Sequence, residues 1–151
     1  MAHQNIAARA PHAARPPFDR TALRVNQAAI VALLVIAFLL DQPWLAGFVG
    51  VVMALGTVTP ALALFQRVYR DVLRPAGLLR PDLHEEDPAP HRFAQGMGAA
   101  VLLLGVAALF AGLSALGWGL ALLVVALAAI NLVFGFCAGC FVYFQLQRLR
   151  R

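Results

Sequence analysis

Residues 28–58 read AAIVALLVIAFLLDQPWLAGFVGVVMALGTV, two apolar runs joined by the short polar segment Asp41-Gln42-Pro43. Neither run contains a charged side chain. The first run is shorter than the roughly 20 residues that a membrane-crossing helix needs, so its helix must also include Asn26 and Gln27 and can extend to Arg24. Proline is favoured at the first position of a helix, where its missing N–H leaves no bond unmade. The stretch therefore predicts a helical hairpin whose turn lies at 41–43 and whose second helix begins near Trp44.

Further along the chain, two more apolar runs repeat this pattern. We predict an all-α membrane protein with four transmembrane helices in two antiparallel hairpins. The spans are expected at about residues 22–40, 44–65, 93–113 and 118–144, within a membrane domain of residues 19–146. Residues 1–18 are predicted to be a flexible tail, 66–92 a loop and 147–151 a basic tail. Asp19 or Thr21 is suited to cap the first helix, and the apolar periodicity of 65–73 predicts a short interfacial helix after the second span.

The positive charges indicate how the spans are oriented. All 12 basic residues are arginines, and they fall into three groups at 9–24, 67–92 and 148–151. The short connections at 41–43 and 112–117 carry none. Because short loops rich in Lys and Arg stay in the cytoplasm, we predict a bacterial inner-membrane protein with both termini and the long loop on the cytoplasmic side.

Composition excludes several classes of protein. The chain is 62% apolar and 13% charged, whereas soluble domains are about 25% charged. The net charge of +5 comes from arginines that flank spans instead of forming one basic face, so we expect the lipid bilayer as a partner and no nucleic acid. A cleaved signal peptide is excluded because the second apolar run follows the first directly.

Several residues inside the spans have predicted structural roles. Pro60 predicts a kink, with Thr57 close enough to help satisfy the freed backbone carbonyl. Asn131 lies near the middle of the fourth span, where we predict a hydrogen bond to Thr57, either direct or through water, with a translocation path as the alternative. Glycines spaced by seven predict a face of close helix approach in the third span, namely Gly98, Gly105 and Gly112.

Polar residues from three spans are expected at one depth, near the cytoplasmic end. They are Asn26, Gln27, His91, Arg92, Gln95, Cys137, Cys140 and Tyr143. Polar groups in membrane segments usually face the protein interior or water and are often functional. The alternative is that helix ends are where polar residues cost least. The cysteines, the histidine and the arginine are the catalytic candidates, and the three amides and the tyrosine are the binding candidates.

The motif Cys137-Ala-Gly-Cys140 gives the most specific chemical signal. Positions three apart share a helix face, which is compatible with a disulfide, a shared metal ion or simple packing. At the C-terminal end of a helix the dipole disfavours a thiolate, so a reactive pair needs a cation such as Arg92, protonated His91 or Arg24. Cys140, expected nearer the surface, is the predicted attacking thiol. A reducing cytosol argues against a permanent disulfide and allows a cycling one.

No metal and no cofactor is predicted. Structural zinc takes four ligands, and the chain offers two thiols together with His91 or His84. Two-coordinate Cu(I) would suit the thiols, but the three methionines are scattered instead of forming a path to the site.

Three motifs resemble a known family. Leu23-Arg-Val-Asn-Gln27, His91-Arg-Phe-Ala-Gln-Gly96 and Gly135-Phe-Cys-Ala-Gly-Cys140 are similar, in order and spacing, to the motifs of small bacterial membrane proteins grouped as domain of unknown function 4395. The similarity covers about residues 18–146. It implies a four-helix membrane protein without an established activity, and an association with thiol or sulfur proteins.

We therefore predict a small inner-membrane protein whose dithiol takes part in thiol redox or sulfur transfer with a thiol or sulfur-carrier protein. Whether it is an enzyme stays open. One alternative is a non-catalytic accessory or scaffolding subunit, or a homo-oligomer assembled through the glycine face of the third span. Another alternative is a permeation path for a small sulfur species or a metal.

Overall fold

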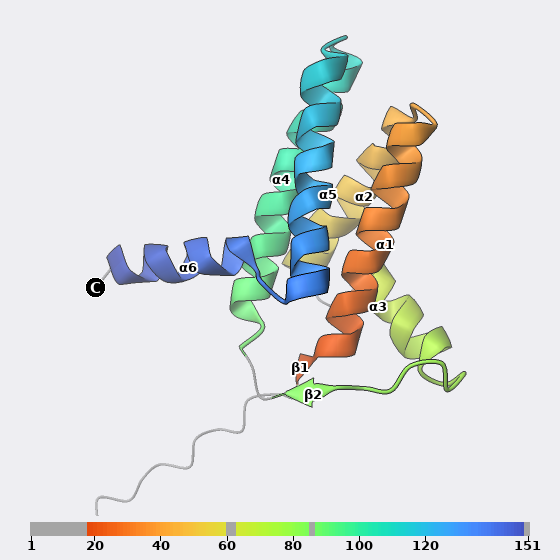
Figure 1. Ribbon diagram of the computed structural model, residues 1–151, viewed down its shortest axis with the longest axis vertical. Coiled ribbons are helices and arrows are strands. Elements are labelled where there is room, and N and C mark those ends of the chain that lie inside the picture. The colour runs from red at the N-terminus through yellow and green to blue at the C-terminus, as the bar shows by residue number, and fades with distance from the viewer. Residues whose placement is uncertain (1–17, 60–62, 85–86, 150–151) are drawn as a thin grey trace, which may run out of the picture.

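The computed structural model describes residues 18–59, 63–84 and 87–149 (Figure 1). The helices are α1 (Arg20–Leu39), α2 (Pro43–Val58), α3 (Leu64–Val68), the π-helical turn η2 (Tyr69–Leu73), α4 (Ala89–Phe110), α5 (Ser114–Phe134) and α6 (Ala138–Leu149). Within these ranges the only strands are β1 (Phe18–Asp19) and β2 (Leu83–His84), which pair antiparallel over two residues each. The predicted all-helical class is confirmed.

Four helices form a bundle of two antiparallel hairpins, α1–α2 and α4–α5 (Figure 1). The contacts run in a ring, from α1 to α2, α2 to α4, α4 to α5, and α5 back to α1. The helices α2 and α5 therefore lie diagonally across the bundle. Both short turns are at one end, while the start of α1 and the end of α5 are at the other.

The bundle has an apolar interior and an apolar exterior. Leu34, Val49 and Leu102 are fully buried between the helices, whereas Leu104 and Val133 are exposed on its outside. Three helices, α1, α4 and α5, are long and apolar enough to cross a membrane, and α2 is a shorter apolar helix. For helices surrounded by lipid, close packing contributes more to association than the hydrophobic effect does.

The helix starts follow the local chemistry that the sequence indicates. Asp19 caps α1, and its carboxylate accepts hydrogen bonds from the backbone N–H groups of Thr21 at 2.9 Å and Ala22 at 3.4 Å. The Thr21 hydroxyl instead donates to the Arg80 carbonyl at 2.9 Å, which ties the start of α1 to the loop. Pro43 is the first residue of α2, as predicted.

The second span is shorter than expected. It ends at Val58, not near residue 65, and Thr59 has an extended backbone with φ −128° and ψ 106°. A residue that precedes proline is disfavoured in the α conformation, so Pro60 accounts for the end. The kink predicted at Pro60 lies outside the described residues. Helical structure resumes as α3 and η2, where the short helix over 65–73 was expected.

The fourth span is not one helix to residue 144. The helix α5 ends at Phe134, because Gly135 adopts the left-handed conformation with φ +67°, which stops a helix. After residues 135–137 the chain begins α6, which runs crosswise to the bundle axis (Figure 1). This break is the largest departure from the sequence-based prediction.

The three glycines predicted to share a face of the third span, Gly98, Gly105 and Gly112, do not form a single packing face. Gly105 is buried, and a methyl group there would lie 3.0 Å from the Gly117 carbonyl oxygen of α5. Gly98 faces Met53 of α2, and Gly112 occupies the turn after α4 with φ +81° and open space around it. Only Gly105 mediates the predicted close backbone approach, and it does so inside the bundle.

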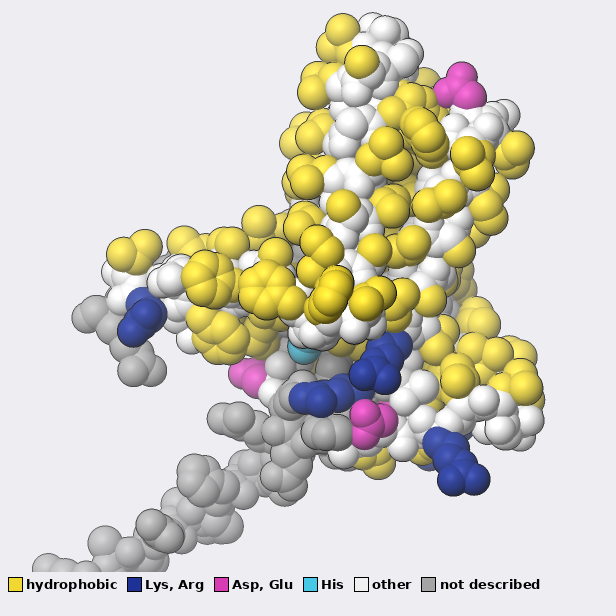
Figure 2. All heavy atoms as spheres, in the orientation of Figure 1, with side chains coloured by type: hydrophobic (Ala, Val, Ile, Leu, Met, Phe, Trp, Pro, Cys, Tyr) yellow, Lys and Arg dark blue, Asp and Glu magenta, His cyan; other side chains and the backbone are white. Residues whose placement is uncertain are grey.

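Charge is distributed unevenly between the two ends of the bundle. On the face drawn in Figure 2, the arginine side chains all lie at the end of the bundle with α6 and β2, with acidic side chains among them, while the opposite end shows an acidic side chain and no arginine. At that opposite end the Trp118 indole N–H donates to the Asp41 carboxylate at 3.0 Å. The end of the bundle with α6, β2 and the described arginines is called the arginine-rich end below.

Candidate disulfide site

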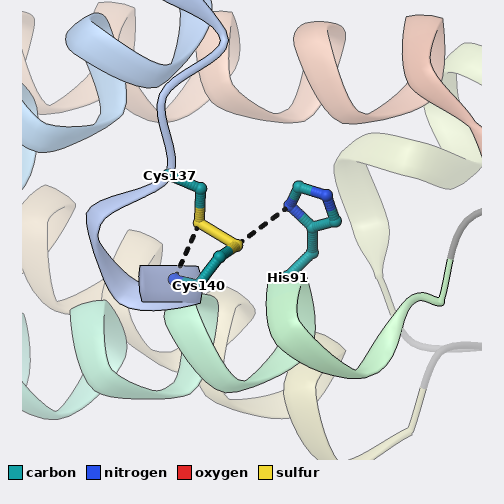
Figure 3. A group of neighbouring side chains, drawn as sticks. All are labelled: His91, Cys137 and Cys140. Carbon is teal, nitrogen blue, oxygen red and sulfur yellow. Dashed lines mark hydrogen bonds between the residues drawn. A yellow bond between two sulfur atoms is a disulfide. The ribbon is translucent and has the colours of Figure 1, made fainter. Parts of the chain in front are cut away.

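Cys137 and Cys140 form a disulfide at the junction between α5 and α6 (Figure 3). Cys137 is the residue directly before α6, and Cys140 lies in the first turn of α6. The left-handed backbone of Gly135 ends α5 and forms this junction. A residue with a side chain would be strained in that conformation. The pair that the sequence predicts is therefore brought together, in its oxidised form.

Gly139 allows the start of α6 to dock against α4. A methyl group on Gly139 would lie 2.5 Å from the Cβ and 2.7 Å from the Cα of Ala94. Carbon atoms in contact are normally 3.5–4.0 Å apart. Because Gly139 has no side chain, the start of α6 can lie directly against α4, and this contact sets the position of both cysteines relative to α4.

The helix dipole at the site has the opposite sign to that predicted. Cys137 precedes the N-terminus of α6, whose free N–H groups carry partial positive charge. The backbone N–H of Cys140 donates to Cys137 Sγ, at an N···S distance of 3.1 Å. Both features stabilise a thiolate on Cys137 once the disulfide is reduced. The predicted obstacle, a helix C-terminus, is absent because α5 has already ended.

Exposure also reverses the predicted roles of the two cysteines. Cys140 is buried with 9% of its surface exposed, whereas Cys137 is half-buried and lines a cavity. The premise that Cys140 lies nearer the surface is wrong. Cys137 is the sulfur that an incoming group can approach.

His91, in the first turn of α4, is the titratable neighbour of the pair. Its Nδ1 lies 3.6 Å from Cys140 Sγ, and its ring points at the disulfide in Figure 3. The ligand atoms of His91, Cys137 and Cys140 lie within 4.8 Å of one another, close enough to share a metal ion after reduction. In the disulfide form neither sulfur is a thiolate, which is the form of cysteine that binds metals.

A cavity of about 170 Å³ adjoins the disulfide, between α1, α4, α5 and the start of α6. Its lining is mainly apolar, from residues such as Ile30, Val101 and Leu127. The polar side chains that line it are Asn26, Gln27, His91, Gln95 and Asn131, together with Cys137. The predicted layer of polar residues therefore exists, and most of its members face one space.

Two of these amides connect three helices. Asn26 Nδ2 of α1 donates to Gln95 Oε1 of α4 at 3.5 Å, and Gln95 Nε2 donates to the Met53 carbonyl of α2 at 3.1 Å. Asn26 has 4% of its surface exposed and is the buried polar residue of the described chain. Buried amides need such partners, so this relay fixes the helices around the cavity.

Two predicted site residues lie elsewhere. The Arg92 guanidinium donates to the carbonyls of Thr57, at 2.7 and 3.3 Å, and Val58, at 3.3 Å. It caps the C-terminus of α2 and does not reach the cysteines. Tyr143 packs against Phe93 in α4, and its hydroxyl accepts a hydrogen bond from Gln147 at 2.9 Å.

Within the described residues, no direct hydrogen bond joins Asn131 and Thr57. The two residues lie on α5 and α2, which are diagonal in the bundle, and the Thr57 hydroxyl donates to the Met53 carbonyl at 2.9 Å. Asn131 lines the cavity instead. A polar residue inside an apolar span indicates that Asn131 has a role, and the sequence shows this. The direction of its side chain depends on the rotation of α5, which the sequence does not show. In the sequence, the apolar residues that line the cavity cannot be distinguished from ordinary residues of the helix-packing core.

Residues 18–148 match the model of a family described as a domain of unknown function, DUF4395. No curated protein and no solved structure matches the chain.

Proposed function

The chain belongs to the DUF4395 family, whose description assigns no activity, and we propose that it is a membrane thiol–disulfide exchange protein. The observation that carries the proposal is the position of the Cys137–Cys140 pair, directly before and within the first turn of α6. A dithiol at a helix N-terminus is the arrangement in which one thiol becomes a good nucleophile and leaving group. Redox cycling of this pair is the proposed activity.

The two sulfurs take different parts in the exchange. A substrate thiolate attacks Cys137 Sγ, the S–S bond breaks, and Cys140 leaves as a thiolate next to His91. His91 supplies a proton to that sulfur when its ring is protonated. A second substrate thiolate then attacks the substrate sulfur of the mixed disulfide, which releases a substrate disulfide and leaves Cys137 and Cys140 reduced. Two electrons and two protons move to the protein in each cycle.

We also propose that all four bundle helices cross a bacterial inner membrane, with the arginine-rich end in the cytoplasm. The distribution of arginines supports this orientation. The 16 residues of α2 rise about 24 Å, less than the hydrocarbon thickness of about 30 Å. The extended residue Thr59 adds to that length.

The amphipathic helix α6 fits the cytoplasmic interface. Phe141, Phe144 and Leu149 are exposed on it, and Arg148 lies in its last turn. A helix with apolar and basic residues that lies across a bundle end is typical of an interfacial helix. The disulfide at its start would then be within reach of cytoplasmic thiols.

The test is a trapping experiment with two single-cysteine variants in native membranes. Cys140→Ser leaves Cys137 to attack a disulfide-bonded partner, which forms a mixed disulfide and releases one partner thiolate; the adduct is stable because the resolving sulfur is gone. Cys137→Ser is the matched control, since the remaining Cys140 is buried and should trap little. Non-reducing gels measure the adducts. Equal trapping by both variants, or trapping by neither, contradicts the proposal.

Sulfur transfer would use the same pair in a different way, with a persulfide carried on Cys137. Mass spectrometry of the reduced protein after exposure to a persulfide donor separates the two activities. A gain of one sulfur atom on Cys137 that a partner thiol removes would favour sulfur transfer over redox cycling.

A further inference from the structure

The cavity beside the disulfide has the size of one six-membered ring. Its volume is about 170 Å³, and an apolar cavity of about 150 Å³ in another protein binds benzene. It lies between helices that are apolar enough to cross a membrane. A ligand that reaches it from the membrane must therefore be lipid-soluble, and the part that enters must be about the size of one ring.

The polar groups of the lining divide into two sets. Asn26 and Gln95 are committed to the relay that ends on the Met53 carbonyl. Gln27 and Asn131, from α1 and α5, also line the cavity, and within the described part of the chain their amides make no hydrogen bond. They leave two N–H donors for a ligand that carries carbonyl oxygens.

The outer wall of the cavity is thin. Leu123 and Leu127 of α5 line it, yet 48% and 44% of their surfaces are exposed on the outside of the bundle. These two side chains therefore border both the cavity and the outside of the bundle, and we expect a ligand to enter between them.

We propose that this cavity binds the ring of a membrane quinone, which oxidises the Cys137–Cys140 dithiol. The proposal rests on the proposed thiol–disulfide exchange and names its second substrate. Cys137 lines the cavity, so the sulfur that exchanges with thiols also borders the ring. Gln27 and Asn131 donate hydrogen bonds to the quinone carbonyls, which become more basic as the ring accepts electrons.

The reaction balances without a further reagent. The Cys137 thiolate adds to the quinone ring, and the Cys140 thiolate then attacks Cys137 Sγ. As the S–S bond forms, the C–S bond breaks and its electron pair stays on the ring. The two thiol protons go to the two ring oxygens, with His91 accepting the one from Cys140, which it contacts. One dithiol and one quinone give one disulfide and one quinol.

The experiment uses the full-length protein in detergent, reduced with a dithiol, freed of reductant and mixed anaerobically with a short-chain ubiquinone. We expect one quinol per protein by ultraviolet absorbance, together with re-formation of the disulfide. Asn131→Leu and Gln27→Leu should each raise the quinone Kd about tenfold, as expected for the loss of one hydrogen bond of about 1.4 kcal/mol. Ala128→Phe, which fills the cavity, should abolish quinol formation. Gln42→Leu, an exposed amide in the turn at the other end of the bundle, is the matched control and should not change the Kd.

A parallel assay with a soluble dithiol separates the two proposals. Wild-type protein that exchanges with the dithiol but forms no quinol overturns the quinone site and leaves the exchange function standing. Protein that does neither overturns the exchange function. Quinol formation that Ala128→Phe does not reduce would show that the ring reacts elsewhere, which also overturns the proposed site.

Discussion

Gly139→Ala tests how the docking of α6 controls the cysteine pair. The new methyl group would lie 2.5 Å from Ala94 Cβ and 2.7 Å from Ala94 Cα, about 1 Å closer than ordinary carbon contact. Because one of these atoms belongs to the α4 backbone, no side-chain rotation relieves the overlap. The start of α6 must move away from α4, and Cys140 moves with it, away from His91.

Overpacking of this kind costs about 1–3 kcal/mol, which corresponds to a shift of roughly 5- to 150-fold toward an undocked α6. The assay is the rate at which a maleimide labels Cys140 in reduced Cys137→Ser protein, with and without Gly139→Ala. We expect labelling to accelerate within that range, because Cys140 is buried in the docked state.

The matched control is Gly119→Ala, a glycine inside α5 where an added methyl group meets nothing within 4 Å. Alanine is the better helix former by about 1 kcal/mol, so this change should leave labelling of Cys140 unaltered. Equal labelling in the Gly139 variant and its parent would refute the packing argument. So would an acceleration of the same size in the Gly119 variant.

Three further predictions concern other parts of the chain. Arg92→Gln should lower the unfolding free energy by about 1 kcal/mol, because the hydrogen bonds to the Thr57 and Val58 carbonyls are lost. The thiol-exchange rate should stay unchanged, and a slower exchange would show that Arg92 does act on the cysteines. Tyr69→Phe should make the protein more resistant to alkali. Desolvation, followed by Asp19, raises the Tyr69 pKa above its ordinary 10.0, so ionisation of the phenol destabilises the folded chain as the pH rises above 10, and phenylalanine cannot ionise. Identical alkaline unfolding of variant and wild type would contradict this. Fusions of a cytoplasm-active reporter to each terminus should both be active, and activity at only one end would exclude an even number of spans.

The parts of the fold set by local chemistry could be predicted from the sequence. Asp19 and Pro43 begin helices as their side chains dictate, and the order of apolar and arginine-rich segments predicted which ends of the helices lie together. That order is also why His91 and the cysteines were expected at one depth, where the structure brings them into contact.

The break after α5 could not be predicted with the same certainty. Glycines are frequent in membrane helices, so Gly135 within an apolar run is compatible with a continuous span as well as with a left-handed helix end. Only the backbone conformation, with φ +67°, distinguishes the two. That single residue decides whether Cys137 follows a helix C-terminus or precedes an N-terminus, and hence the sign of the dipole that acts on it.

The directions of the side chains also could not be predicted from the sequence. The depth of Asn131 followed from its position in the sequence, but its neighbours depend on which helices are diagonal in the bundle. The same holds for Arg92, which is adjacent to His91 in sequence yet contacts the end of α2. Helical rotation separates neighbours in sequence by about 100°, and the apolar pattern of a membrane helix does not specify it.

The central claim is that Cys137 and Cys140 form a working redox couple at the start of α6. A redox titration of wild-type protein in native membranes, equilibrated with mixtures of reduced and oxidised thiols and read by maleimide gel shift, tests it most directly. We predict a two-electron transition at a midpoint between about −300 and −120 mV, the range of exchange-active disulfides. A pair that stays oxidised at every poise until the protein is unfolded would contradict the account.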